Sequence, residues 1–126
     1  MKFLGRLFRR TKARSIPAMP SWKTIIKTMY GKQLDAFSDE IVKVIYSHDL
    51  SMRYVILKNR KGLFTYQLEA IYLYNDDQWQ YICTLDHALP ATWQPFTGNA
   101  GHSVFENEDD LLREMKTQPE YQNHFP

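Results

Sequence analysis

The sequence contains very little cysteine and no long hydrophobic run. Cys83 is the only cysteine in 126 residues, which excludes a disulfide framework and a multi-cysteine zinc site within one chain. A lone thiol favours a reducing compartment, so we expect the protein in the cytoplasm. No stretch approaches the roughly 18 apolar residues that span a bilayer. Arg6 interrupts the apolar residues near the start, which disfavours a cleaved signal peptide.

Acidic residues are absent from the first 15 residues. This N-terminal arm, Met1–Ser15, holds six of the 16 lysines and arginines, and the other ten share the rest of the chain with all 14 acids. The formal charge of +2 therefore combines a strongly basic arm with a mildly acidic body. Only the arm is expected to seek phosphates or anionic lipid.

The N-terminal arm has the pattern of a short basic amphipathic helix, with apolar residues at helical spacing and arginines on the other side. Such a helix contacts an anionic membrane or a nucleic acid, docks on the domain, or frays. Membrane contact would make the protein peripheral at the inner membrane. The residues that would make a membrane or nucleic-acid contact are Phe3, Leu4, Arg6, Leu7, Phe8, Arg9 and Arg10.

The length and composition predict one folded domain after the arm. Pro17 and Pro20 make residues 16–20 a linker, so residues 1–20 are arm and linker and residues 21–126 form a single α+β domain. Ser21 is a good N-cap for a helix of about ten residues that ends at Gly31. Four runs rich in β-branched and aromatic residues then predict an antiparallel meander: Ile41–Ser47, Met52–Asn59, Leu63–Tyr74 and Gln78–Leu85.

The rest of the chain predicts a bend, a crossover and a second helix. The apolar alternation of the third run changes near Glu69 and Ala70, which predicts a bulge or a bend there. Residues 86–101 carry two prolines and two glycines, so we expect an irregular crossover. A short fifth strand is expected at Ser103–Phe105. Asn107 caps a helix with acids in its first turn. The predicted architecture is an antiparallel sheet of four to five strands, flanked by an N-terminal and a C-terminal helix.

Catalytic and cofactor patterns are scarce. The four histidines fall in expected loops or at the end, without metal-ligand spacing, and Cys83 lies in a predicted strand, where an unreactive thiol is expected. The five glycines form no phosphate-binding loop. We therefore expect no enzyme activity, metal, cofactor or small-molecule substrate. An enzyme would need at least two side chains to converge in a pocket from the set His48, Glu69, Cys83, Asp86 and His87.

Two kinds of binding surface remain open. A basic hairpin tip, Lys58–Lys61, lies near Tyr54, Phe64 and Tyr66, which together sketch a stacking surface for single-stranded nucleic acid. Two acidic clusters instead suit a basic protein partner, although helix capping and solvated turns also explain these acids. The residues expected to bind such a partner are Asp76, Asp77, Trp79, Asp86, Trp93, Glu108, Asp109, Asp110 and Glu114.

The chain resembles the small immunity proteins of bacterial polymorphic toxin systems. The resemblance covers most of residues 21–125 and lies in the segments LEAIYLYNDDQW, LPATWQPF and ENEDDLLREMKTQPEY. It implies a non-enzymatic inhibitor that binds one cognate toxin, whose surface would be basic. The hypothesis from the sequence is therefore a protein-binding immunity module. The alternative is a peripheral membrane or nucleic-acid adaptor that acts through the arm.

Overall fold

In the computed structural model, residues 16–96 and 103–126 are described. They form a four-stranded antiparallel sheet with four helices, which confirms the predicted α+β class. The strands lie in the order β1-β2-β3-β4, so the sheet is a meander. The elements in chain order are α2 (Trp22–Met29), β1 (Glu40–Tyr46), β2 (Met52–Lys58), β3 (Phe64–Leu73), α3 (Asp76–Ile82), β4 (Ala91–Pro95), α4 (Glu108–Met115) and α5 (Pro119–His124).

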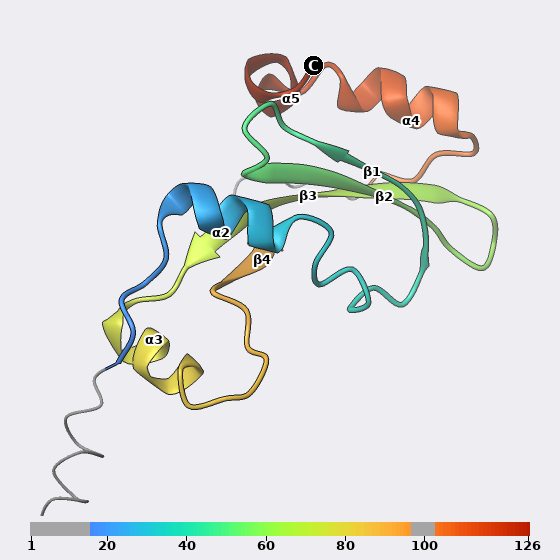
Figure 1. Cartoon of the computed structure of the whole chain (residues 1–126). Coiled ribbons are helices and arrows are strands. Elements are labelled where there is room, and N and C mark those ends of the chain that lie inside the picture. Colours follow the sequence, from blue (N-terminus) through green and yellow to red (C-terminus); the bar gives the residue numbers. More distant parts are fainter. Residues whose placement is uncertain (1–15, 97–102) are drawn as a thin grey trace, which may run out of the picture.

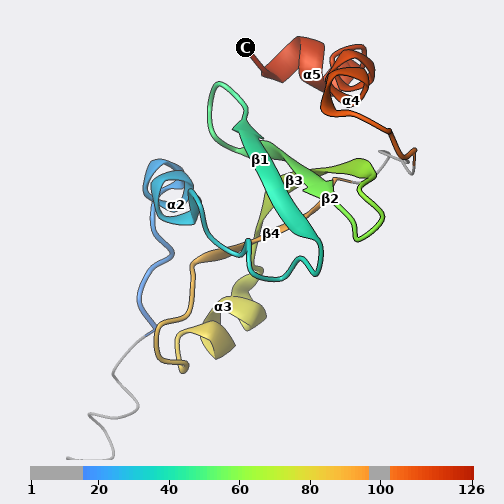
Figure 2. The same cartoon turned by 90° about the vertical axis from the view of Figure 1, so that its right-hand side faces the viewer.

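The helices lie on both faces and beyond one end of the sheet. Helix α2 covers one face, and α4 and α5 cover the other (Figure 1). Helix α3 projects beyond the end of the sheet where β3 leads into β4, and the second view shows the same separation (Figure 2). The predicted helix of the N-terminal arm lies outside the described residues.

Helix α2 forms where the sequence predicts it. The Ser21 hydroxyl oxygen accepts a hydrogen bond from the Thr24 amide at 3.2 Å, which satisfies one of the free donors of the first turn. Ile25 and Met29 lie one turn apart on the same side and are both buried. Their cluster includes Ala91 and Trp93 of β4, so α2 packs on the β4 end of the sheet.

Strands β1, β2 and β3 also follow the prediction, but the expected bulge near Glu69 and Ala70 is wrong. The β2–β3 register runs without a shift from Met52 opposite Ala70 to Lys58 opposite Phe64. A shift occurs instead in β1, between Ile41 and Lys43.

The apolar residues of β3 change parity because the strand is covered on both faces. Tyr66 and Leu68 pack in the cluster that α4 and α5 complete, whereas Ile71 packs against the α2 cluster on the other face. β3 pairs with β2 over residues 64–70 and with β4 over 69–73. The apolar residues therefore switch from one face of β3 to the other although the strand is regular. This switch is the sequence pattern that suggested a bulge.

The predicted fourth strand, Gln78–Leu85, is wrong because this segment contains helix α3. The Asn75 side chain accepts from the Gln78 amide at 2.8 Å, and the Gln78 side chain accepts from the Asn75 amide at 2.9 Å. This capping box, with Asp76 and Asp77 in the first turn, starts a helix despite the β propensity of the aromatic residues that follow. Cys83 is accordingly the C-cap of α3, and is half-buried.

The fourth strand comes from the segment predicted to be an irregular crossover. β4 pairs with β3 from Ala91 opposite Leu73 to Pro95 opposite Glu69. An edge strand tolerates proline because one of its sides carries no ladder partner. Residues 97–102 of the predicted crossover lie outside the described residues.

The C-terminal helix is confirmed, and a second short helix follows it. The Asn107 side chain accepts from the Asp110 amide at 2.8 Å and starts α4. Leu111 and Met115 are fully buried against the sheet. The expected fifth strand at Ser103–Phe105 is reduced, among the described residues, to a single bridge between Phe105 and Phe64.

Candidate docking surface

Helix α3 packs none of its residues into the core, although two of them are aromatic. Tyr81 is 65% exposed, and Leu85, just past the helix, is 44% exposed. Asp77 and Tyr81 lie four residues apart in α3, which places them on the same side of the helix, and Leu85 follows in the turn after the helix. We call the exposed residues Asp76, Asp77, Tyr81 and Leu85 the α3 surface.

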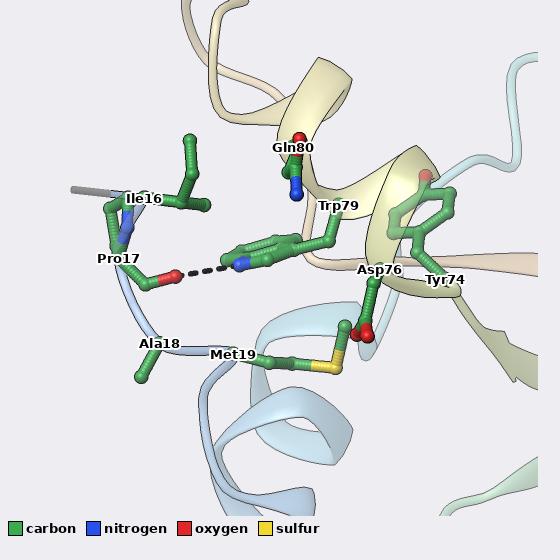
Figure 3. Close-up of a pocket in the computed structure, with 8 residues that line it drawn as sticks. All are labelled: Ile16, Pro17, Ala18, Met19, Tyr74, Asp76, Trp79 and Gln80. Atoms are coloured by element: carbon green, nitrogen blue, oxygen red, sulfur yellow. Dashed lines mark hydrogen bonds between the residues drawn. The ribbon is translucent and has the colours of Figure 1, made fainter. Parts of the chain in front are cut away.

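A strap of chain, residues 16–19, crosses the side of α3 that carries Asp76 and Trp79. The Trp79 indole nitrogen donates to the Pro17 carbonyl oxygen at 2.7 Å. Figure 3 shows the indole reaching away from α3 toward this carbonyl, with the Ile16 and Met19 side chains on either side of it. Met19 also packs against the cluster beneath α2. Residues 16–19 therefore join α3 to the body of the domain.

A pocket of about 370 Å³ lies between the strap and α3. The Asp76 carboxylate and the Gln80 amide give it polar groups, and the Tyr74 hydroxyl donates to the Ala91 carbonyl at 3.2 Å. Burial raises the pKa of Tyr74 above its ordinary value, so this hydroxyl remains a neutral donor at physiological pH. The lining residues are Ile16, Pro17, Ala18, Met19, Tyr74, Asp76, Trp79 and Gln80 (Figure 3).

The stretch of sequence around α3 carries charge of one sign. No lysine or arginine occurs in the sequence between Lys61 and Arg113, whereas Asp76, Asp77 and Asp86 all lie in or just after α3 and are exposed. The predicted partner-binding residues Asp76, Asp77 and Trp79 thus come from one helix. The surface offers carboxylates beside exposed aromatic and aliphatic side chains, which is the chemistry that a basic segment with apolar residues would meet.

The second predicted acidic cluster lies at the far end of the molecule, on α4 (Figures 1 and 2). Glu108 pairs with Lys43 at 3.2 Å, and Asp110 pairs with Arg113 at 2.8 Å. Asp109 and Glu114 are exposed. The two clusters therefore do not form one surface, and neighbouring cations offset part of the charge on α4.

Trp93 does not belong to either surface. Its exposed fraction is 6%, and its indole nitrogen donates to the Met29 carbonyl at 2.8 Å. The sequence predicted it in an irregular crossover, whereas it lies in β4 and packs in the cluster beneath α2. It serves the core instead.

The aromatic residues predicted to form a stacking surface for single-stranded nucleic acid do not form one. Tyr54 is fully buried and Tyr66 is 9% exposed, both beneath α4 and α5, so neither ring can stack on a base. Of the residues named for catalysis, Glu69 is occupied by Arg53 and Gln67, with contacts of 2.8 and 2.9 Å. Within residues 16–96 and 103–126, no group of three or more His, Cys, Asp or Glu side chains could hold a metal ion.

Sequence reasoning missed the apolar part of the α3 surface, because Tyr81 and Leu85 were assigned to a buried strand. The signal that could have found it is the capping sequence Asn75–Gln78, which announces a helix start. Among the described residues, no helix is long and apolar enough to cross a membrane.

Comparisons with family models, with curated proteins and with solved structures found no significant match to this chain.

Proposed function

We propose that this protein is a non-enzymatic binding module that holds a basic protein partner on the α3 surface. The observation that supports the proposal is that α3 leaves Tyr81 and Leu85 exposed beside Asp76 and Asp77. A short helix with no buried residue adds little to the stability of its own domain. Its exposed aromatic side chain is of a type enriched at protein interfaces.

The α3 surface is a better candidate than the acids of α4. Carboxylates without nearby cations attract a basic partner more strongly than carboxylates that are already paired. Glu108 and Asp110 have such pairs, whereas Asp76 and Asp77 form no ion pair with another of the described residues. Tyr81 would supply the apolar contact and Asp76 and Asp77 the orientation.

An immunity protein is the most concrete form of this proposal. Such a protein would block the groove of a toxin whose substrate is a polyanion, because that groove would be basic. The test is co-expression with the product of the adjacent upstream gene. We expect rescue of growth and a stable complex; an absence of both would count against the proposal.

Surface variants make the test specific to α3. Tyr81→Ala is expected to weaken binding roughly tenfold or more. The double variant Asp76→Asn with Asp77→Asn is also expected to bind more weakly than wild type, and its loss of affinity should grow as the salt concentration is lowered. The matched control is Asp109→Asn with Glu114→Gln on α4, which removes two exposed acids from the other end. Weaker binding in the α4 double variant, with unchanged binding in the α3 variants, would contradict the proposal, because the partner would then contact α4.

The second candidate is an adaptor that acts through the N-terminal arm. It is supported by the six basic residues that the arm holds without a single acid. Full-length protein would then bind anionic vesicles or oligonucleotides in a salt-sensitive way. Changing Arg6, Arg9 and Arg10 to Gln should abolish that binding, and vesicle or oligonucleotide binding that persists in this variant would reject it.

A further inference from the structure

We infer that the N-terminal arm docks on the α3 surface of its own chain. The inference concerns an occupant inside the molecule, and an external partner that binds the α3 surface would have to displace the arm. Three observations support it: the place where the arm joins the described structure, the opposite charges of the two segments, and the apolar residues that each of them carries.

The arm joins the domain directly beside α3. Ile16, the residue after the arm, lines the pocket against α3 and is itself 42% exposed. The next residue, Pro17, accepts the hydrogen bond from the Trp79 indole. Figure 3 shows both residues against the helix. The arm therefore starts at the edge of the surface that it would cover.

The charges of the two segments are complementary. The arm carries six basic residues and no acid. The stretch around α3 carries Asp76, Asp77 and Asp86, with no basic residue nearby in sequence. Because the arm is tethered next to these acids, its effective concentration there is high, so docking loses less translational freedom than the binding of a separate molecule.

Both segments also carry large apolar residues. Seven large apolar side chains in the described residues are exposed, and four of them lie in or next to α3 or the strap. The arm has four apolar residues at helical spacing. In the docked state these residues and the four exposed side chains would remove each other from water. The exposed side chains are those of Ile16, Leu73, Tyr81 and Leu85, and the arm residues are Phe3, Leu4, Leu7 and Phe8.

The arm is long enough to reach. Seven residues, 9–15, separate its apolar residues from Ile16, and an extended chain of that length spans at most about 25 Å. Helix α3 has seven residues, so it is only about 10 Å long. The segment between the apolar residues and Ile16 is therefore longer than α3 itself.

The test measures the proximity of arm and helix in the full-length chain. Gly5 lies off the apolar stripe of the arm, so a nitroxide spin label is attached at Gly5→Cys in a Cys83→Ser background. We expect the amide resonances of residues 77–85 to broaden, and those of α4, Glu108–Met115, to stay sharp. Reduction of the nitroxide gives the reference spectrum.

Matched variants separate specific docking from random contact. Tyr81→Ser with Asp77→Asn should abolish the broadening, as should Arg6→Gln with Arg9→Gln and Arg10→Gln. The α4 pair Asp109→Asn and Glu114→Gln should leave it unchanged. Broadening that is absent, that spreads evenly over the domain, or that survives in the Tyr81 variant overturns the inference.

A mixed sample identifies the occupant. Spin-labelled, unenriched protein is mixed with unlabelled, isotope-enriched protein, so any broadening must come from a second molecule. We expect none; broadening at α3 in this sample would assign the surface to the arm of another copy and overturn docking within one chain. Binding of a toxin is measured separately, so a chain that binds its partner but shows no arm contact rejects only this inference.

Discussion

The Arg53 guanidinium and the Glu69 carboxylate form a buried ion pair across strands β2 and β3, with 2.8 Å between Nε and Oε1. The two residues are direct neighbours in the register. Arg53 is fully buried, and its guanidinium also lies 4.2 Å from the centre of the Trp93 ring. It donates to the carbonyls of Lys32 and Gln33 as well, so it ties the segment after α2 to the sheet.

The Arg53–Glu69 pair predicts strongly non-additive mutations. Glu69→Leu leaves a buried cation without its carboxylate and is expected to cost about 3–5 kcal/mol of unfolding free energy. Arg53→Met is expected to cost at least as much, because the two loop carbonyls lose their donor as well. The double variant should lose clearly less than the sum. Urea unfolding of the four proteins measures this, and additive losses would show that the pair is not coupled.

The Tyr54 hydroxyl can be removed without loss of unfolding free energy. This hydroxyl is buried beneath α5 and has no hydrogen-bond partner among the described residues. Burial raises the pKa of Tyr54 far above its ordinary value, with a smaller contribution from Glu120. Removing an unpaired buried hydroxyl relieves its desolvation cost, so Tyr54→Phe should leave the protein equally stable or stabilise it by about 1 kcal/mol.

The matched control for Tyr54 is Leu68, which is 1% exposed in the same cluster. Leu68→Ala creates a cavity and should cost about 2–5 kcal/mol. Thermal or urea unfolding of the two variants gives the comparison. A loss of stability in Tyr54→Phe similar to that in the leucine variant would mean that the hydroxyl has a partner after all.

Asp49 predicts a loss of stability in acid. Partial burial opposes its ionisation, but hydrogen bonds from Ser51 and Ser47 outweigh burial and lower its pKa below the ordinary 3.8. A lowered pKa in the folded state adds stability above the unfolded value, and this stability disappears as the pH falls through the folded value.

The variant Asp49→Asn removes the titrating group of the β1–β2 turn. Wild type should be the more stable protein at neutral pH, and the difference should shrink as the pH falls below about 4, the ordinary range of an aspartate. Urea unfolding between neutral pH and pH 2 measures the difference. A constant gap across that range would mean that the charge of Asp49 does not contribute.

Local signals predicted much of the fold. Ser21 and Asn107 cap α2 and α4 where the sequence places them, because a cap is a contact between residues three apart. The β-rich runs of β1, β2 and β3 are also where expected. The prediction for the segment after Asn75 was wrong because two local signals compete there: a capping box favours a helix, while Trp79 and Tyr81 favour a strand.

The candidate site was only partly visible in the sequence. Asp76, Asp77 and Trp79 were named from the charge and aromatic content of one segment, and the structure places them on one helix. The exposure of Tyr81 and the burial of Trp93 could not be predicted, because each depends on which distant segment covers the residue.

The sequence alone determined the class of the fold, the positions of the capped helices and the separation of a basic arm from an acidic body, since these follow from neighbouring residues and from composition. The tertiary structure decided which segment became the fourth strand and which aromatic side chains were left uncovered. Ala91–Pro95 becomes β4 because it pairs with the edge of β3 that β2 leaves open. Tyr81 of α3 is exposed because no element of the described chain packs over it. Contacts between residues far apart in sequence set both outcomes, and no local pattern records them.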